Sequence, residues 1–181
     1  MIRALPWLVF VALASCATQE PSTSQPPQSD GTVDSQDTDG SSDTRLDVPS
    51  SSASSADVER VSVSGGPGAY SFSVTIKSPD TGCAQYADWW EVLTPQGELL
   101  YRRILAHSHV DEQPFARSGG PVDIQADQTV WVRAHMNTSG YGTQVMELTP
   151  DRAQDQRAIT VPAGTAEGLA QQAPLPGTCA F

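Results

Sequence analysis

Large apolar side chains alternate with small polar ones along much of the chain after residue 57, which is the period of a β-strand with one buried face. The clearest case runs from Tyr70 to Ile76, where four large apolar residues alternate with three hydroxyl side chains. No window shows a long helical period, and turn residues separate the apolar runs. The pattern predicts seven short strands, at 61–63, 70–76, 89–93, 99–105, 121–124, 129–136 and 144–148.

Seven short strands within residues 58–181 favour an all-β fold, an antiparallel β-sandwich of immunoglobulin-like or fibronectin-III-like topology. A tryptophan on the third strand fits this topology. Trp89 and Trp90 are neighbours and therefore point to opposite faces of their strand. One of them faces the core and the other faces the surface or a ligand, and the pattern does not decide which.

The start of the chain has a different pattern, with one positive charge at Arg3 followed by a nearly continuous apolar run at 5–13. Small residues and then Cys16 follow this run. These features predict an export signal at 1–15, which is too short to span a membrane as a helix.

The tetrapeptide at 13–16, Leu-Ala-Ser-Cys, resembles the lipobox of bacterial lipoproteins. The resemblance implies that lipid is attached to Cys16 and that the chain is anchored in the cell envelope. In a Gram-negative host, Ala17 after the cysteine favours the outer membrane. The alternative is an ordinary secretory signal that contains a cysteine.

Residues 16–57 separate this signal from the alternating pattern and consist mainly of Ser, Thr, Gln, Asp, Pro and Gly. Eight acidic side chains stand here against Arg45 alone, a net charge of −7. Such a segment buries too little apolar surface to offset the entropy of ordering, so we predict a disordered linker. The acidic run could instead bind calcium or a basic partner, but scattered carboxylates are typical of a solvated spacer.

The whole chain has 10 basic and 21 acidic side chains, a formal net charge of −11. Electrostatic nucleic-acid binding requires clustered positive charge, so this composition argues against a nucleic-acid partner.

With Cys16 lipidated, Cys83 and Cys179 remain as an even pair in an oxidising compartment. We therefore expect them to form a disulfide that ties the C-terminal tail to the sandwich. A cysteine-based metal site is the alternative, and the lack of a Cys-x-x-Cys motif argues against it.

All three histidines lie in two places, His107 and His109 in a loop and His135 at the end of a strand. The expected topology brings these places to one edge of the fold, where three imidazoles would suit zinc or copper. Asp111 or Glu112 could add a fourth ligand. The alternatives are a structural clasp, with a buried histidine hydrogen-bonded to an aspartate, or simple exposure to solvent.

The expected topology also places a candidate binding edge around the strand that carries the two tryptophans. Arg117 could bind an anion there, although an ion pair with a loop carboxylate is the alternative. A hydrolase using Ser118 and a histidine is a further possibility, but the sequence around this serine lacks the context of an activated nucleophile. The residues of this candidate edge are Tyr86, Asp88, Trp90 and Arg117.

Four segments, at 86–93, 100–105, 107–115 and 117–121, resemble a family of uncharacterised bacterial proteins that are predicted lipoproteins. Their letters are YADWWEVL, LYRRIL, HSHVDEQPF and RSGGP. The family has no established activity, so the resemblance implies no catalytic residue.

Together these features predict an envelope lipoprotein that presents a non-enzymatic β-sandwich for binding or assembly. Its expected partners are the membrane, through the lipid, and an envelope protein or small ligand. No cofactor is expected. The alternatives are a periplasmic zinc or copper protein that uses His107, His109, His135 and Asp111, and a hydrolase.

Overall fold

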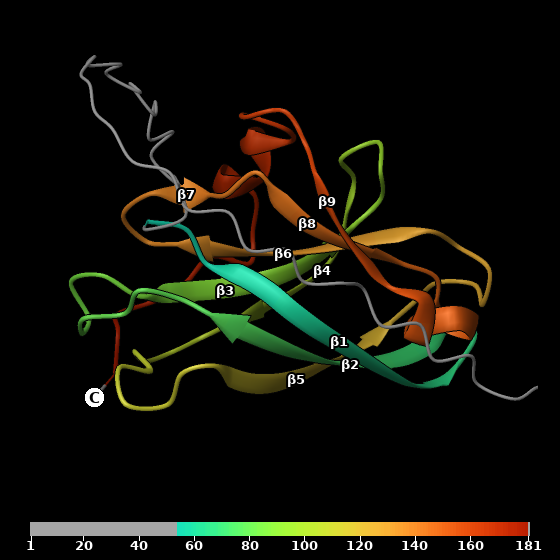
Figure 1. Cartoon of the computed structure of the whole chain (residues 1–181), viewed down its shortest axis with the longest axis horizontal. Helices are drawn as coiled ribbons and strands as arrows, with labels where there is room; N and C mark the ends of the chain where they lie inside the picture. Colours follow the sequence, from blue (N-terminus) through green and yellow to red (C-terminus); the bar gives the residue numbers. More distant parts are fainter. Residues whose placement is uncertain (1–53, 181) are drawn as a thin grey trace, which may run out of the picture. The chain divides into compact units, whose positions relative to one another are not determined.

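The computed structural model describes residues 54–180, which form two antiparallel sheets packed face to face (Figure 1). The first sheet has the order β1-β2-β5, and the second has the order β4-β3-β6-β8-β9, with β7 paired to β6. The strands of the first sheet are β1 (Asp57–Gly66), β2 (Ala69–Lys77) and β5 (Phe115–Val122). Those of the second are β3 (Ala87–Leu93), β4 (Leu99–Ile104), β6 (Val130–Met136), β7 (Gly140–Tyr141), β8 (Gln144–Leu148) and β9 (Arg157–Thr160).

The order of the strands confirms the predicted β-sandwich. A three-stranded sheet of the first, second and fifth strands against a second sheet centred on β3 and β6 is the fibronectin-III-like arrangement. Two short 3-10 helices, η2 (Pro150–Asp155) and η3 (Glu167–Gln171), follow β8 and β9. Within residues 54–180, no helix is long and apolar enough to cross a membrane.

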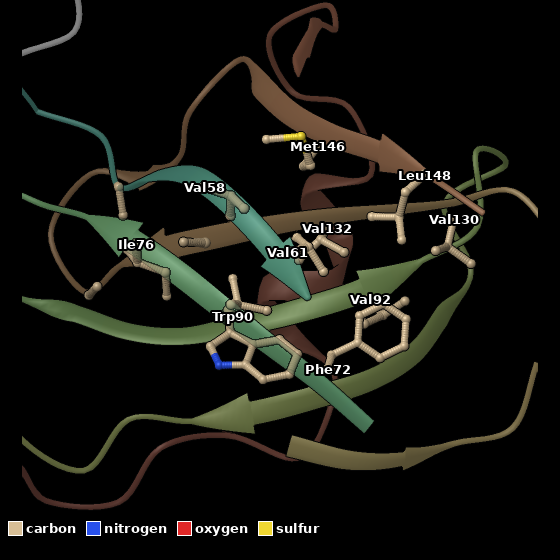
Figure 2. Packing of buried hydrophobic residues seen from close by; sticks show 14 of the residues in the cluster. Val58, Val61, Phe72, Ile76, Trp90, Val92, Val130, Val132, Met146 and Leu148 are labelled. Atoms are coloured by element: carbon tan, nitrogen blue, oxygen red, sulfur yellow. The ribbon is translucent and has the colours of Figure 1, made fainter. Parts of the chain in front are cut away.

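Alternating side chains of both sheets fill the core, as the close view in Figure 2 shows for Phe72, Trp90 and Val92. Trp90 is the inner tryptophan and is 0% exposed. Its ring packs near Gly119 of β5, where an added Cβ would lie 3.0 Å from Trp90 Cζ2 and 2.7 Å from Tyr101 Oη. A glycine at 119 therefore makes room for the two aromatic rings between the sheets.

One predicted strand is misplaced, and two strands of the structure were not predicted. The fifth strand spans Phe115–Val122 and not 121–124, because its first half pairs with β2 although Gly119 and Gly120 interrupt the apolar alternation. The strands β7 and β9 were not expected, since neither has a buried apolar face. The predicted signal at 1–15, and the linker up to residue 53, lie outside the described residues.

The C-terminal tail after β9 covers the outer face of the second sheet. Backbone carbonyls of this tail accept hydrogen bonds from Arg102 of β4 and Arg133 of β6. The disulfide between Cys83 and Cys179 then holds the end of the tail. In Figure 1 the last described part of the tail, drawn in red, accordingly lies at the end of the sandwich where β3 begins.

Candidate functional site: the His109 pocket

The loop between β4 and β5 carries His107 and His109. The buried carboxylate of Asp80 holds this loop in place through hydrogen bonds. One carboxylate oxygen of Asp80 accepts hydrogen bonds from Ser78 Oγ (2.7 Å) and from the amide of Ala87 (3.0 Å). The other accepts from the amide of His109 (2.8 Å). A single buried carboxylate thus joins the β2–β3 connection to the histidine loop and sets the position of His109.

The imidazole of His109 is buried but has no hydrogen-bond partner. The residue is 3% exposed, and its ring stacks on Phe115 at 3.7 Å between centroids and 8° between planes. Neither ring nitrogen has a partner among the described residues. The nearest carboxylate oxygen, on Asp80, lies 3.9 Å from Nδ1, which is beyond hydrogen-bonding distance.

Burial also keeps this imidazole neutral. Desolvation lowers the pKa of His109 below its ordinary value of 6.5, and the neighbouring Arg117 and His107 lower the pKa further. A neutral imidazole carries one N–H donor and one acceptor nitrogen. His109 therefore has one hydrogen-bond donor and one acceptor, and neither has a partner among the described residues.

A pocket of about 390 Å³ opens beside this ring, and we name it the His109 pocket. Its walls come from three separate stretches of chain, the histidine loop, the β2–β3 connection and the tail end. The amide of Ala180 donates a hydrogen bond to the carbonyl of Ala106 (2.6 Å), which closes the tail onto the loop. The pocket is lined by Gly82, Cys83, His107, Ser108, His109, Val110, Asp111, Glu112 and Ala180.

The other buried histidine, His135 of β6, has a carboxylate partner. Its Nδ1 lies 2.7 Å from Asp88 Oδ1, and its ring stacks on Trp89 at 3.6 Å. This is the aspartate clasp that the sequence allowed as an alternative. Tyr141 packs edge-on against the same imidazole, with ring centroids 4.7 Å apart.

The clasp belongs to a larger buried cluster on the outer face of the second sheet. Glu91 is 0% exposed and lies between two arginines, with Arg102 Nε and Arg133 Nε each 2.9 Å from its carboxylate. Arg102 lies 4.5 Å above the ring of Trp89, and Arg133 lies 3.4 Å from the ring centroid of Tyr141. We name this cluster the outer-face network; it comprises Asp88, Trp89, Glu91, Arg102, Arg133, His135 and Tyr141.

The predicted binding edge is not an accessible surface in the structure. Tyr86 and Asp88 are 4% and 3% exposed, and Trp90 is part of the core. Arg117 pairs with Glu112 at 2.7 Å, which is the loop ion pair that the sequence allowed. Trp90 is buried between the two sheets, and Asp88 is enclosed with His135, so these positions present no accessible binding surface.

The expected three-histidine centre does not form either. His107 and His109 are neighbours, with ring centroids 4.6 Å apart, but His135 belongs to the outer-face network. Within residues 54–180, no three His, Cys, Asp or Glu side chains come together so as to hold a metal ion. Asp111 is exposed at the mouth of the His109 pocket.

Sequence reasoning missed the residues that organise both regions. Asp80, Glu91, Arg102, Arg133 and Tyr141 were not singled out. A signal existed for Glu91 and Arg133 alone, because each is a charged residue inside an otherwise apolar strand.

A protein of Halomicrobium mukohataei described as "Putative lipoprotein" is 35% identical to this chain over 157 residues, which cover 75% of this chain and 78% of the relative. This chain belongs to that lipoprotein family. Membership supports the resemblance to lipoproteins and a membrane-anchored envelope protein. Lipid attachment at Cys16 and an outer-membrane location are not shown by it and stay predictions. No family model and no solved structure matches the lipoprotein.

Proposed function

We propose that this lipoprotein is anchored in the cell envelope through Cys16 and binds a small ligand in the His109 pocket without catalysing a reaction. The tetrapeptide before Cys16 and the lipoprotein relative support the anchor. The pocket lies at the loop end of the sandwich, where β-sandwich proteins often carry their binding residues.

The observation that carries the proposal is the unpaired imidazole of His109. A buried polar group without a partner costs about 1–3 kcal/mol, so native structures rarely keep one without a use. Here the unpaired nitrogens belong to a residue that lines an open pocket, and Ser108, in the same lining, also has a buried and unpaired hydroxyl. The His109 side chain is 1% exposed, so a ligand reaches its nitrogens when the ring turns towards the pocket. A ligand that offers both a donor and an acceptor would satisfy these groups.

A binding role fits this arrangement better than hydrolysis. A catalytic histidine works through a hydrogen bond to a nucleophile and is oriented by a second one to an acid. His109 makes neither bond within the described residues. His135 is bonded to Asp88, but its ring packs between Trp89 and Tyr141 and does not line the His109 pocket.

The anchor is tested by replacing Cys16 with serine in the full-length protein in cells. The unsubstituted protein should fractionate with membranes and carry a diacyl modification in mass spectra, and Cys16→Ser should lose both. An unmodified Cys16 thiol in protein purified from membranes would contradict lipid anchoring.

The pocket is tested with benzyl alcohol, whose hydroxyl is both donor and acceptor and whose ring can contact apolar wall residues such as Val110. Ring ¹⁵N signals of His109 in residues 54–181, expressed as a secreted, disulfide-bonded fragment and first shown to unfold cooperatively, should shift in a saturable way. The signals of His135 should not move. His109→Phe should abolish the saturable response of the neighbouring His107 ring, and saturable binding that survives this substitution would contradict the assignment.

A further inference from the structure

The histidine loop, residues 105–114 between β4 and β5, is held in place by few buried groups. From residue 106 to residue 114, His109 is the one buried residue, and the others are half-buried or exposed. Segments with few buried contacts open locally more easily than the strands of a core. We infer that the loop opens more often when the imidazole of His109 takes up a proton, which makes the loop a pH-sensitive gate at the end of the sandwich. The inference goes beyond the proposed function, because it requires no ligand in the pocket.

The closed loop does not accommodate a charged imidazole. The His109 side chain is 1% exposed, and neither ring nitrogen has a hydrogen-bond partner among the described residues. The ring lies flat on Phe115, with 3.7 Å between centroids. A charged group that is buried without a partner costs far more free energy than a neutral one. Protonation therefore favours an arrangement of the loop that returns this ring to water.

The charged groups around His109 do not compensate for its burial. Burial is the largest effect on this ring, and Arg117 of β5 and His107 of the same loop also disfavour a positive charge on it. The ring centroid of His107 lies 4.6 Å away. Asp80 and Glu112 favour the charge, but their effects are smaller, so the pKa of His109 is lowered below its ordinary value of 6.5. The ring therefore binds a proton more tightly in an open loop than in a closed one.

Asp80 is also poorly placed to pair with a protonated ring. One of its carboxylate oxygens already accepts two hydrogen bonds, and the other accepts from the amide of His109. His109 Nδ1 lies 3.9 Å from this carboxylate, so a direct bond requires the ring to move off Phe115. The other acidic neighbour, Glu112, is already paired with Arg117 at 2.7 Å.

Opening of the loop breaks polar contacts at both of its neighbours. The amide of His109 leaves the carboxylate of Asp80, and the carbonyl of Ala106 leaves the amide of Ala180 at the end of the tail. The loop and the tail end both line the His109 pocket. Acid should therefore loosen this end of the sandwich while the two sheets stay folded.

Hydrogen–deuterium exchange of the full-length protein in detergent tests the inference, read by mass spectrometry on peptides from the loop at pH 7 and pH 5 and corrected for intrinsic rates. A ring that has a pKa of 6.5 in the open loop and stays neutral in the closed loop makes opening about 25-fold more favourable at pH 5 than at pH 7. Protection of the loop should fall by about this factor. At both pH values the loop should exchange faster than peptides from β3 and β6, which distinguishes local opening from global unfolding.

His109→Phe keeps a ring on Phe115 and removes the titrating group, so its loop should be equally protected at both pH values. The matched control is His107→Gln, at an exposed position of the same loop, which should keep most of the pH dependence. Unchanged or greater protection of the loop at pH 5 would overturn the inference. So would a pH dependence that survives His109→Phe or disappears in His107→Gln, or a loop that exchanges as slowly as β3 and β6.

Discussion

The lipoprotein buries two histidines in opposite ways. His135 has a carboxylate partner, an aromatic stack and a covering tail, and the charged groups around it are paired with one another. His109 is buried as deeply, but its ring nitrogens have no partner among the described residues, and the residue lines the His109 pocket. In the outer-face network the charged groups are paired, and the indole nitrogen of Trp89 is the one buried side-chain polar atom without a partner among the described residues. Paired buried charges stabilise a fold, whereas an unpaired imidazole in a residue that lines a pocket is a candidate for ligand binding.

The largest expected effect comes from breaking the outer-face network at its centre. Glu91→Ala leaves Arg102 and Arg133 buried without their carboxylate, which should lower the free energy of unfolding by about 3–5 kcal/mol. Urea denaturation of the fragment measures this change. Glu59→Ala, at an exposed position of β1, is the control and should change stability by less than about 0.5 kcal/mol. A loss at Glu91 no larger than the control would mean that the network is not structural.

The disulfide affects both regions, because it fixes the C-terminal tail. This tail covers the outer-face network, and its end forms part of the wall of the His109 pocket. Replacing both Cys83 and Cys179 by serine opens a loop between positions 96 residues apart and should cost about 2–4 kcal/mol. The same variant should bind benzyl alcohol more weakly, since Ala180 and Cys83 line the pocket. Unchanged binding in the folded variant would show that the tail is not part of the site.

Substituting phenylalanine for each histidine should give effects of different size and sign. His135→Phe leaves the buried carboxylate of Asp88 without its partner and should destabilise the domain by about 1–3 kcal/mol. His109→Phe keeps the stack on Phe115 and removes two unpaired nitrogens, so the free energy of unfolding should rise or stay within about 0.5 kcal/mol. Equal destabilisation by both substitutions would remove the contrast between the two regions.

The smallest effect is a pH dependence from Tyr141 in the outer-face network. Burial and the nearby Glu91 carboxylate raise the pKa of Tyr141 to about 12 from an ordinary value of 10.0. The unfolded chain therefore loses this proton at lower pH than the folded one, and stability should fall as pH rises from 10 towards 12. Tyr141→Phe should flatten this part of the stability curve, as measured by urea denaturation at several alkaline pH values. Parallel curves for the two proteins would show that the hydroxyl is not enclosed.

The sequence predicted the sandwich because alternation was strong where both sheets contribute to one core. The segment from Tyr70 to Ile76 lies within β2, and its alternate residues Phe72, Val74 and Ile76 are fully buried. Prediction failed for β5, where Gly119 makes room for the rings of Trp90 and Tyr101 and so breaks the apolar alternation. β5 still pairs with β2, but position 119 must leave space for these two rings and therefore cannot carry an apolar side chain.

The outer-face network could not be predicted for a different reason. Five of the hydrogen bonds that cover Arg102 and Arg133 go to backbone carbonyls of residues 165–174. Every residue has a carbonyl, so a tail rich in Ala, Gly and Pro shows no pattern that marks it as a partner for arginine. The disulfide was the one feature of this covering that the cysteine count predicted, and the structure confirms it.

The central claim, that one buried histidine is paired and the other is not, is tested most directly by ring ¹⁵N spectra of the ligand-free fragment recorded as the pH is lowered. Because the folded pKa of His109 is depressed, its ring should stay neutral as the pH falls past 6.5, while the unfolded chain takes up a proton there and stability declines. A His109 ring that protonates at or above pH 6.5 would contradict the account. It would mean that the imidazole has closed onto Asp80 and forms a second clasp in place of an open site.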